Sequence, residues 1–156
     1  MAISKSIDVE ELLQLYAAGE RDFSFINIEG SDELYQANLS GINLSNSSVG
    51  EIFMEGSNLS EANLKGAQLG QTCLRNTNLR GADLTSADLR YANLDGADLT
   101  DAKLTNACLR NVVMRGANLT DADLTGAEIE FIQEMVKDSI FCRTIMPDGS
   151  IYNGTI

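Results

Sequence analysis

The strongest constraint on this chain is a five-residue rhythm: an aliphatic residue stands at every fifth position, without a gap, from Leu39 to Ile129. The residue two positions earlier is small in most units, as in Ala82-Asp83-Leu84-Thr85-Ser86. A helix repeats every 3.6 residues and a strand every two, so neither would bring these side chains to one side. A chain that turns a corner once per unit would do so, and the fixed period predicts a solenoid.

The polar positions of the units support the corner interpretation. The second residue after the aliphatic centre is often Gly, Asn or Asp, which tolerate positive φ and tight turns best. We therefore expect the central residue and the small residue before it to point inward, and the others to face solvent. The predicted core includes Leu39, Leu44, Leu59, Leu64, Leu79, Leu84, Leu99, Leu104, Leu119 and Leu124.

The repeated triplets carry a family resemblance. The runs Ala62-Asn63-Leu64, Ala82-Asp83-Leu84 and Ala117-Asn118-Leu119 resemble the pentapeptide-repeat family, in the style of its cyanobacterial members. The resemblance covers nearly two thirds of the chain. It implies an all-β solenoid, a right-handed quadrilateral β-helix with four units per coil. Departures at the small site, Ile42, Ile52 and Val112, suggest local repacking within the same fold.

We expect a single domain over residues 1–156, with a short helix at 8–18 covering the first end of the solenoid. Asp8 is a favourable N-cap with Glu11 three residues later, and Gly19 is a natural stop. An uncovered solenoid end would expose unpaired backbone, which explains why a cap is needed.

The repeat region is expected to span residues 21–131, opening with two degenerate units centred on Phe23 and Ile28. The six-residue step from Ile28 to Leu34 predicts a one-residue bulge around residues 30–32.

After Ile129 the phase breaks, and helical spacing of apolar residues predicts a second short capping helix at 130–138. Residues 139–156 return to the five-residue phase with Phe141, Met146, Ile151 and Ile156. This segment forms either an irregular last coil or a hairpin tail packed on the side of the solenoid.

The sequence offers little for catalysis or cofactor binding. The chain has no histidine, so a serine or cysteine nucleophile lacks its usual base. The three cysteines are widely spaced and show no metal-ligand pattern, and the glycines form no phosphate loop. We therefore expect no enzyme activity, no cofactor, no metal and no small-molecule substrate. The net charge of −12 disfavours direct nucleic-acid binding.

The same composition predicts a cytoplasmic protein with no membrane partner. No secretory signal is recognisable at the N-terminus, and no apolar run approaches membrane-spanning length. An odd, scattered set of cysteines argues against a disulfide framework and fits a reducing compartment.

One outward column is unexpectedly apolar. With 20 residues per coil, one face carries Tyr35, Phe53, Cys73 and Val113 on its outside, near Arg75 and Arg115. A terminal segment covers this column, which we prefer, or the column is an interface with another subunit or protein, or the exposure has no consequence. The reactivity of the Cys73 thiol would separate the first two.

These features favour a non-catalytic structural or protein-binding role with an unidentified protein partner. The alternative is DNA mimicry directed at a type II topoisomerase such as gyrase, as the family resemblance implies. Charge weighs against it, because twelve acidic and seven basic side chains between residues 35 and 131 leave a net −5. A duplex carries about 14 charges over the corresponding length of about 24 Å.

Overall fold

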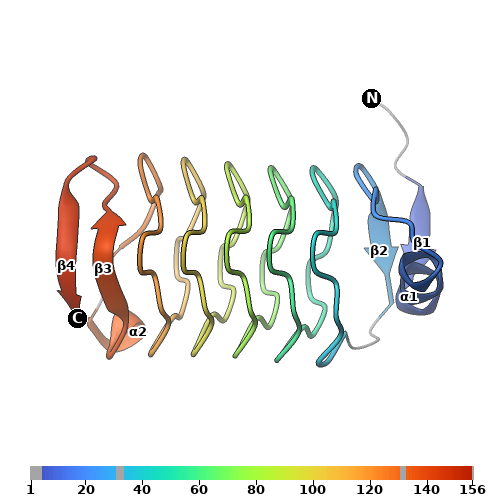
Figure 1. Ribbon diagram of the computed structural model, residues 1–156, viewed down its shortest axis with the longest axis horizontal. Helices are drawn as coiled ribbons and strands as arrows, with labels where there is room; N and C mark the ends of the chain where they lie inside the picture. The colour runs from blue at the N-terminus through green and yellow to red at the C-terminus, as the bar shows by residue number, and fades with distance from the viewer. Residues whose placement is uncertain (1–4, 31–33, 131–132, 156) are drawn as a thin grey trace.

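The computed structural model describes residues 5–30, 34–130 and 133–155, and it shows a stack of similar coils with different closures at its two ends (Figure 1). Successive coils are joined by parallel bridges between residues 20 positions apart, for example Asn63 to Asp83 and Asp83 to Lys103. Each coil of this solenoid therefore contains four five-residue units. Within a unit the backbone is extended only around the centre, because a corner follows at once.

The interior of the stack is a continuous column of aliphatic side chains. The ten leucines predicted as core have at most 1% of their surface exposed. Burying one such side chain contributes about 1.5–3 kcal/mol, so the repeated leucine is the main source of stability. The departures Ile42, Ile52 and Val112 at the small site are also buried, so the solenoid accommodates larger side chains there.

The outward Asp and Asn residues shape the corners. In many units the side-chain oxygen accepts a hydrogen bond from the backbone N–H two residues later, as in Asp83 to Thr85 and Asp123 to Thr125. The corner residue that follows has positive φ, for example Asp101 at 59° and Gly81 at 64°. The Asp or Asn directly before the central leucine therefore stabilises a turn, which is a common role of these residues.

Where the small site holds Ser or Thr, the hydroxyl can be satisfied inside the core. Thr77 Oγ1 donates to the carbonyl of Met54 at 3.0 Å, and Ser47 Oγ donates to the carbonyl of Phe23 at 2.7 Å. The acceptor belongs in both cases to the central residue of the preceding coil. These bonds remove the cost of burying a hydroxyl and join neighbouring coils.

The first end is closed by a strand and a helix. Strand β1 (Ser6–Asp8) pairs in parallel with β2 (Asn27–Glu29), and helix α1 (Val9–Ala17) follows β1 directly. Asp8 is the N-cap, and its carboxylate accepts the Glu11 N–H at 2.7 Å. Val9 and Leu12 are buried against the first coil. The sequence indicated the helix but not the strand that begins the stack.

The extra residue of the first coil lies between Ile28 and Leu34. Asn27 bridges Ser48, 21 residues later, whereas the Leu34 N–H binds the Phe53 carbonyl in the ordinary register. Gly30 has a φ of 112°, and residues 31–33 lie outside the described part of the chain. The predicted bulge at 30–32 therefore falls mostly outside the described residues.

The other end contains helix α2 (Gln133–Val136) and a hairpin of β3 (Ile140–Ile145) and β4 (Ile151–Thr155). Residues 131 and 132, part of the predicted 130–138 helix, lie outside the described residues. Asn118 bridges Ile140, so two additional residues are inserted before the last coil. Ser139 and Thr144 occupy small sites, and their hydroxyls donate to the carbonyls of Met114 and Leu119.

The segment after 139 begins as a last coil, one of the two alternatives that the sequence left open, and ends as a hairpin at the end of the stack and not as a tail packed on the side of the solenoid (Figure 1). Phe141 is fully buried as a core residue, so β3 belongs to a last coil. After Pro147 the chain reverses, and β4 pairs antiparallel with β3. The five-residue phase therefore ends at Met146: Ile151 is 67% exposed, and Ile156 lies outside the described residues.

Candidate interaction face

The apolar outward column lies on the face whose core residues are Met54, Leu74, Leu94 and Met114. Phe53 bridges Cys73, Cys73 bridges Asn93, and Asn93 bridges Val113. The Phe53 side chain is 53% exposed, and those of Cys73 and Val113 are half-buried. All three therefore point outward, as the 20-residue register predicts.

The position of Tyr35 needs a correction. Because the Leu34 N–H binds the Phe53 carbonyl, Leu34 aligns with Met54 and Tyr35 aligns with Glu55. Tyr35 thus belongs to the same face but to the neighbouring column, one position after the core residue. Plain counting by 20 gives the same alignment, because Tyr35 lies 20 residues before Glu55, so the column assigned to Tyr35 from the sequence was off by two positions. Tyr35 is 54% exposed.

The preferred interpretation of this column, coverage by a terminal segment, is wrong for Phe53. A side chain with 53% of its surface exposed is not beneath another segment. The described termini instead close the two ends of the stack: α1 lies over the first coil, and β4 lies beyond β3 (Figure 1). The apolar column is therefore open to solvent at Phe53.

A further aromatic residue borders this face and was not recognised in the sequence. Tyr91 stands at the corner two residues before Asn93, is 63% exposed and has a φ of 61°. Gly and Asn adopt this backbone conformation readily, whereas it is strained for Tyr. The available signal was an aromatic residue at a corner position that usually holds Gly, Asn or Asp.

We call the surface of Tyr35, Phe53, Cys73, Tyr91, Val113 and the intervening polar residues the aromatic face. Its charges are partly paired: Arg115 Nη2 lies 2.6 Å from Asp95 Oδ2. Arg75 stands exposed between Glu55 and Asp95 in the same column, and it forms no ion pair with any residue that the structure describes. The face therefore presents aromatic rings beside an available guanidinium group.

Next to Tyr91 the surface is hollowed. An open recess of about 200 Å³ is lined by Gly70, Gln71, Asp88, Arg90 and Tyr91. Arg90 Nε and Nη2 donate to the Asp88 carboxylate at 2.8 and 2.5 Å. The hydrogen bond from Arg90 holds the pKa of Asp88 below its ordinary value. The guanidinium group of Arg90 is thus paired with the Asp88 carboxylate. The recess therefore gives the edge of the face a concave surface and not an unpaired charge.

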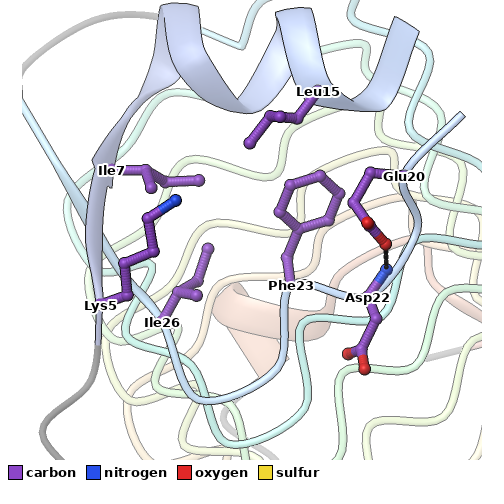
Figure 2. Close-up of a pocket in the computed structure, with 7 residues that line it drawn as sticks. All are labelled: Lys5, Ile7, Leu15, Glu20, Asp22, Phe23 and Ile26. Atoms are coloured by element: carbon purple, nitrogen blue, oxygen red, sulfur yellow. Dashed lines mark hydrogen bonds between the residues drawn. The ribbon is translucent and has the colours of Figure 1, made fainter. Parts of the chain in front are cut away.

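A second cavity, of about 260 Å³, lies between α1 and the first coil (Figure 2). Leu15 extends from the helix toward Phe23. Lys5, Ile7 and Ile26 line the side of the cavity opposite Glu20 and Asp22. Glu20 accepts the Asp22 N–H at 2.9 Å, and the backbone donors of Asp22 and Arg21 lower the pKa of the Glu20 carboxyl. Because its lining is mostly apolar, we interpret this cavity as a gap in the packing between α1 and the first coil.

Metal and membrane chemistry find no support in the described part of the chain. No group of three or more His, Cys, Asp or Glu side chains there is arranged to hold a metal ion. Cys73, Cys108 and Cys142 are free thiols, each half-buried. Neither described helix is long and apolar enough to cross a membrane.

The fold and its surface define a β-solenoid of five-residue units. A family model for pentapeptide repeats matches in eight copies over residues 37–76, 62–101, 77–116 and 97–130. The chain belongs to the pentapeptide-repeat family. No curated protein matches the chain.

Solved structures of the same family resemble this one. A pentapeptide repeat protein from the cyanobacterium Cyanothece 51142 is 28% identical, with 83% of this chain and 96% of that one covered and a TM-score of 0.58. One from the thylakoid lumen of Arabidopsis thaliana is 37% identical, with a TM-score of 0.57. That match covers 58% of this chain and 63% of the plant protein. One from Nostoc PCC 7120 is 36% identical, covers 78% of this chain and 84% of that one, and has a TM-score of 0.44.

Proposed function

We propose that this protein is a non-catalytic scaffold that binds a protein partner through the aromatic face. The observation that carries the proposal is the placement of Tyr35, Phe53 and Tyr91, each more than half exposed, around one wall of the rod. We also infer right-handed, quadrilateral winding of the coils, as the family resemblance implies.

The composition of the face supports this role. Protein interfaces are enriched in aromatic residues and arginine, and hot spots are frequently Tyr or Arg. Here the exposed aromatic rings and the exposed Arg75 belong to one face, while Cys73 and Val113 supply smaller apolar contacts.

The rigidity of the scaffold also favours binding. The rings are fixed to a backbone that hydrogen-bonds to neighbouring coils, for example from the Tyr91 N–H to the Arg110 carbonyl. A partner therefore meets a preformed surface, and little free energy is lost in ordering it. A catalytic role has less support, since the chain has no histidine base.

The test uses the full chain as bait in its native cell extract, with quantitative detection of specifically retained proteins. Phe53→Glu should abolish capture while leaving the thermal midpoint nearly unchanged, because the ring is half exposed. The control is Phe25→Glu: Phe25 is 57% exposed but lies at a corner away from the aromatic face, in line with Asn46. Equal capture by wild type and Phe53→Glu would overturn the proposal.

A gyrase supercoiling assay with the pure protein tests the competing mechanism. We expect no inhibition, because the repeat region carries about one third of the charge of a duplex of the same length. Inhibition that survives Phe53→Glu would replace the scaffold proposal with DNA mimicry.

A further inference from the structure

The outermost strands at the two ends of the stack differ in how well their free edges are protected from pairing with another chain. At the first end, β1 has only three residues, is flanked by Lys5, contains Asp8 and runs directly into α1. Short strands and charged residues are the usual devices that prevent an edge from pairing with another chain. The first end is therefore protected.

At the other end, β4 has none of these devices. Its sequence, Ile-Tyr-Asn-Gly-Thr, contains no charge and no proline, and it is the outermost strand beyond β3 (Figure 1). β3 occupies one edge of β4, and no described residue pairs with its other edge. Exposed apolar side chains gather here, since Ile140, Ile151 and Tyr152 are 43%, 67% and 38% exposed.

We propose that the free edge of β4 pairs antiparallel with β4 of a second copy of this chain, about a two-fold axis near Asn153. The sheet of β3 and β4 then continues across the axis into the second molecule. This contact lies at the end of the rod and is independent of the aromatic face.

A second copy is the occupant that the structure favours, for two reasons. An antiparallel pair of identical strands is self-complementary, so one contact satisfies both free edges and closes the assembly. Head-to-tail stacking would instead require the protected edge of β1. End-to-end contact also keeps apart two chains that each carry a charge of −12, since screening limits repulsion to about 8 Å at physiological salt.

The side chains agree with this register. Centred on Asn153, it sets Tyr152 opposite the partner's Gly154 and Ile151 opposite the partner's Thr155. Within each chain the Tyr152 ring already covers Gly154, lying 3.0 Å from where a Cβ of that residue would stand, so the glycine brings no side chain that would obstruct the contact. Asn153 itself is fixed, because its side-chain oxygen accepts the Arg143 N–H at 2.8 Å.

Sedimentation of the full chain over a dilution series, with reductant present, tests the proposal. The mass should move between one and two times 16.9 kDa. Ile151→Lys should raise the dimer dissociation constant by about tenfold or more, because a charged, hydrated side chain replaces an apolar one on the shared edge and opposes strand pairing there. Phe25→Lys, with the same change at a similarly exposed ring far from β4, should leave the constant unchanged.

Hydrogen exchange of β4 provides a readout that does not depend on mass. The amides of residues 151–155 should exchange more slowly in the wild type as concentration rises, and Ile151→Lys should abolish that dependence. Circular dichroism verifies that this variant stays folded. A monomer at every concentration, or a dimer that Ile151→Lys leaves intact, would overturn the proposal.

Discussion

The middle of this molecule and its two ends stabilise the same kind of coil in different ways. Between Leu39 and Ile129 each coil has a coil on both sides, and its backbone N–H and C=O groups pair at fixed offsets. At the ends one neighbour is missing. There the chain adds β1 and α1 on one side, and α2 with the β3–β4 hairpin on the other.

This difference explains why the repeat pattern specifies the central coils but not the ends. In the middle, one five-residue rule is sufficient, because every unit has the same environment. At the ends the environment differs from residue to residue, since Leu12 seals the first coil whereas Phe141 fills the last. Stability in the middle is therefore shared among similar contacts, whereas each end depends on a few particular ones.

Substitutions in the central coils should cause the largest loss of stability. Leu84→Ala or Leu89→Ala should lower the free energy of unfolding by about 2–5 kcal/mol, because each removes a fully buried side chain and leaves a cavity between neighbouring coils. Thr85→Ser, at the corner beside Leu84, should stay within about 0.5 kcal/mol. Denaturant titration measures both, and equal effects would contradict the inward and outward assignment.

The next effect concerns the first end. Asp8→Ala removes the acceptor for the Glu11 N–H and should cost about 1 kcal/mol, with Asp8→Asn losing much less. Thermal unfolding of the three proteins checks this. If Asp8→Ala matched the wild type, the cap of α1 would contribute nothing to the closure.

A smaller effect of opposite sign is expected at the aromatic face. Tyr91→Asn should stabilise the protein by about 0.5–1 kcal/mol, because Asn accepts positive φ more easily than Tyr. Thermal unfolding measures the gain, and partner capture should fall in the same variant. Stabilisation without loss of capture would remove Tyr91 from the proposed interface.

The smallest effect is a dependence on pH. Hydrogen bonds from Thr125 lower the pKa of Asp123, so the ionised carboxylate favours the folded state. That contribution is complete above the unfolded pKa of about 3.9 and is lost as pH falls through the lower folded value. Asp123→Asn should therefore weaken the loss of stability between about pH 5 and pH 2, measured by denaturant titration at each pH. An unchanged acid limb would assign the pH dependence to other carboxyl groups.

The sequence predicted the middle well for a physical reason. Each central leucine has one environment, so its period alone identifies the core, and the corner residues reveal the turns. The helix after Asp8 was visible because its cap is a local pattern. β1 could not be predicted, since Ser6–Asp8 becomes a strand only by pairing with residues 21 positions away.

The candidate face was predicted only in part. Phe53, Cys73 and Val113 followed from the 20-residue register, whereas Tyr35 did not belong to their column, because it lies 18 residues before Phe53. Exposure also could not be predicted, because it depends on where the terminal segments pack. Tyr91 was overlooked because one aromatic residue at a corner does not disturb the pattern of the core.

Residue-resolved hydrogen exchange tests the comparison between middle and ends most directly. We expect the backbone amides of residues 58–124 that donate to carbonyls of neighbouring coils to exchange only through global unfolding, and the corner amides that donate to Asp or Asn side chains, such as that of Thr85, to exchange faster. The amides of α1 should exchange faster, through local opening, because the helix is attached by one apolar face. If α1 exchanged as slowly as the central coils, with the same dependence on denaturant, the ends would be no less stable than the middle, and the proposed difference between them would be wrong.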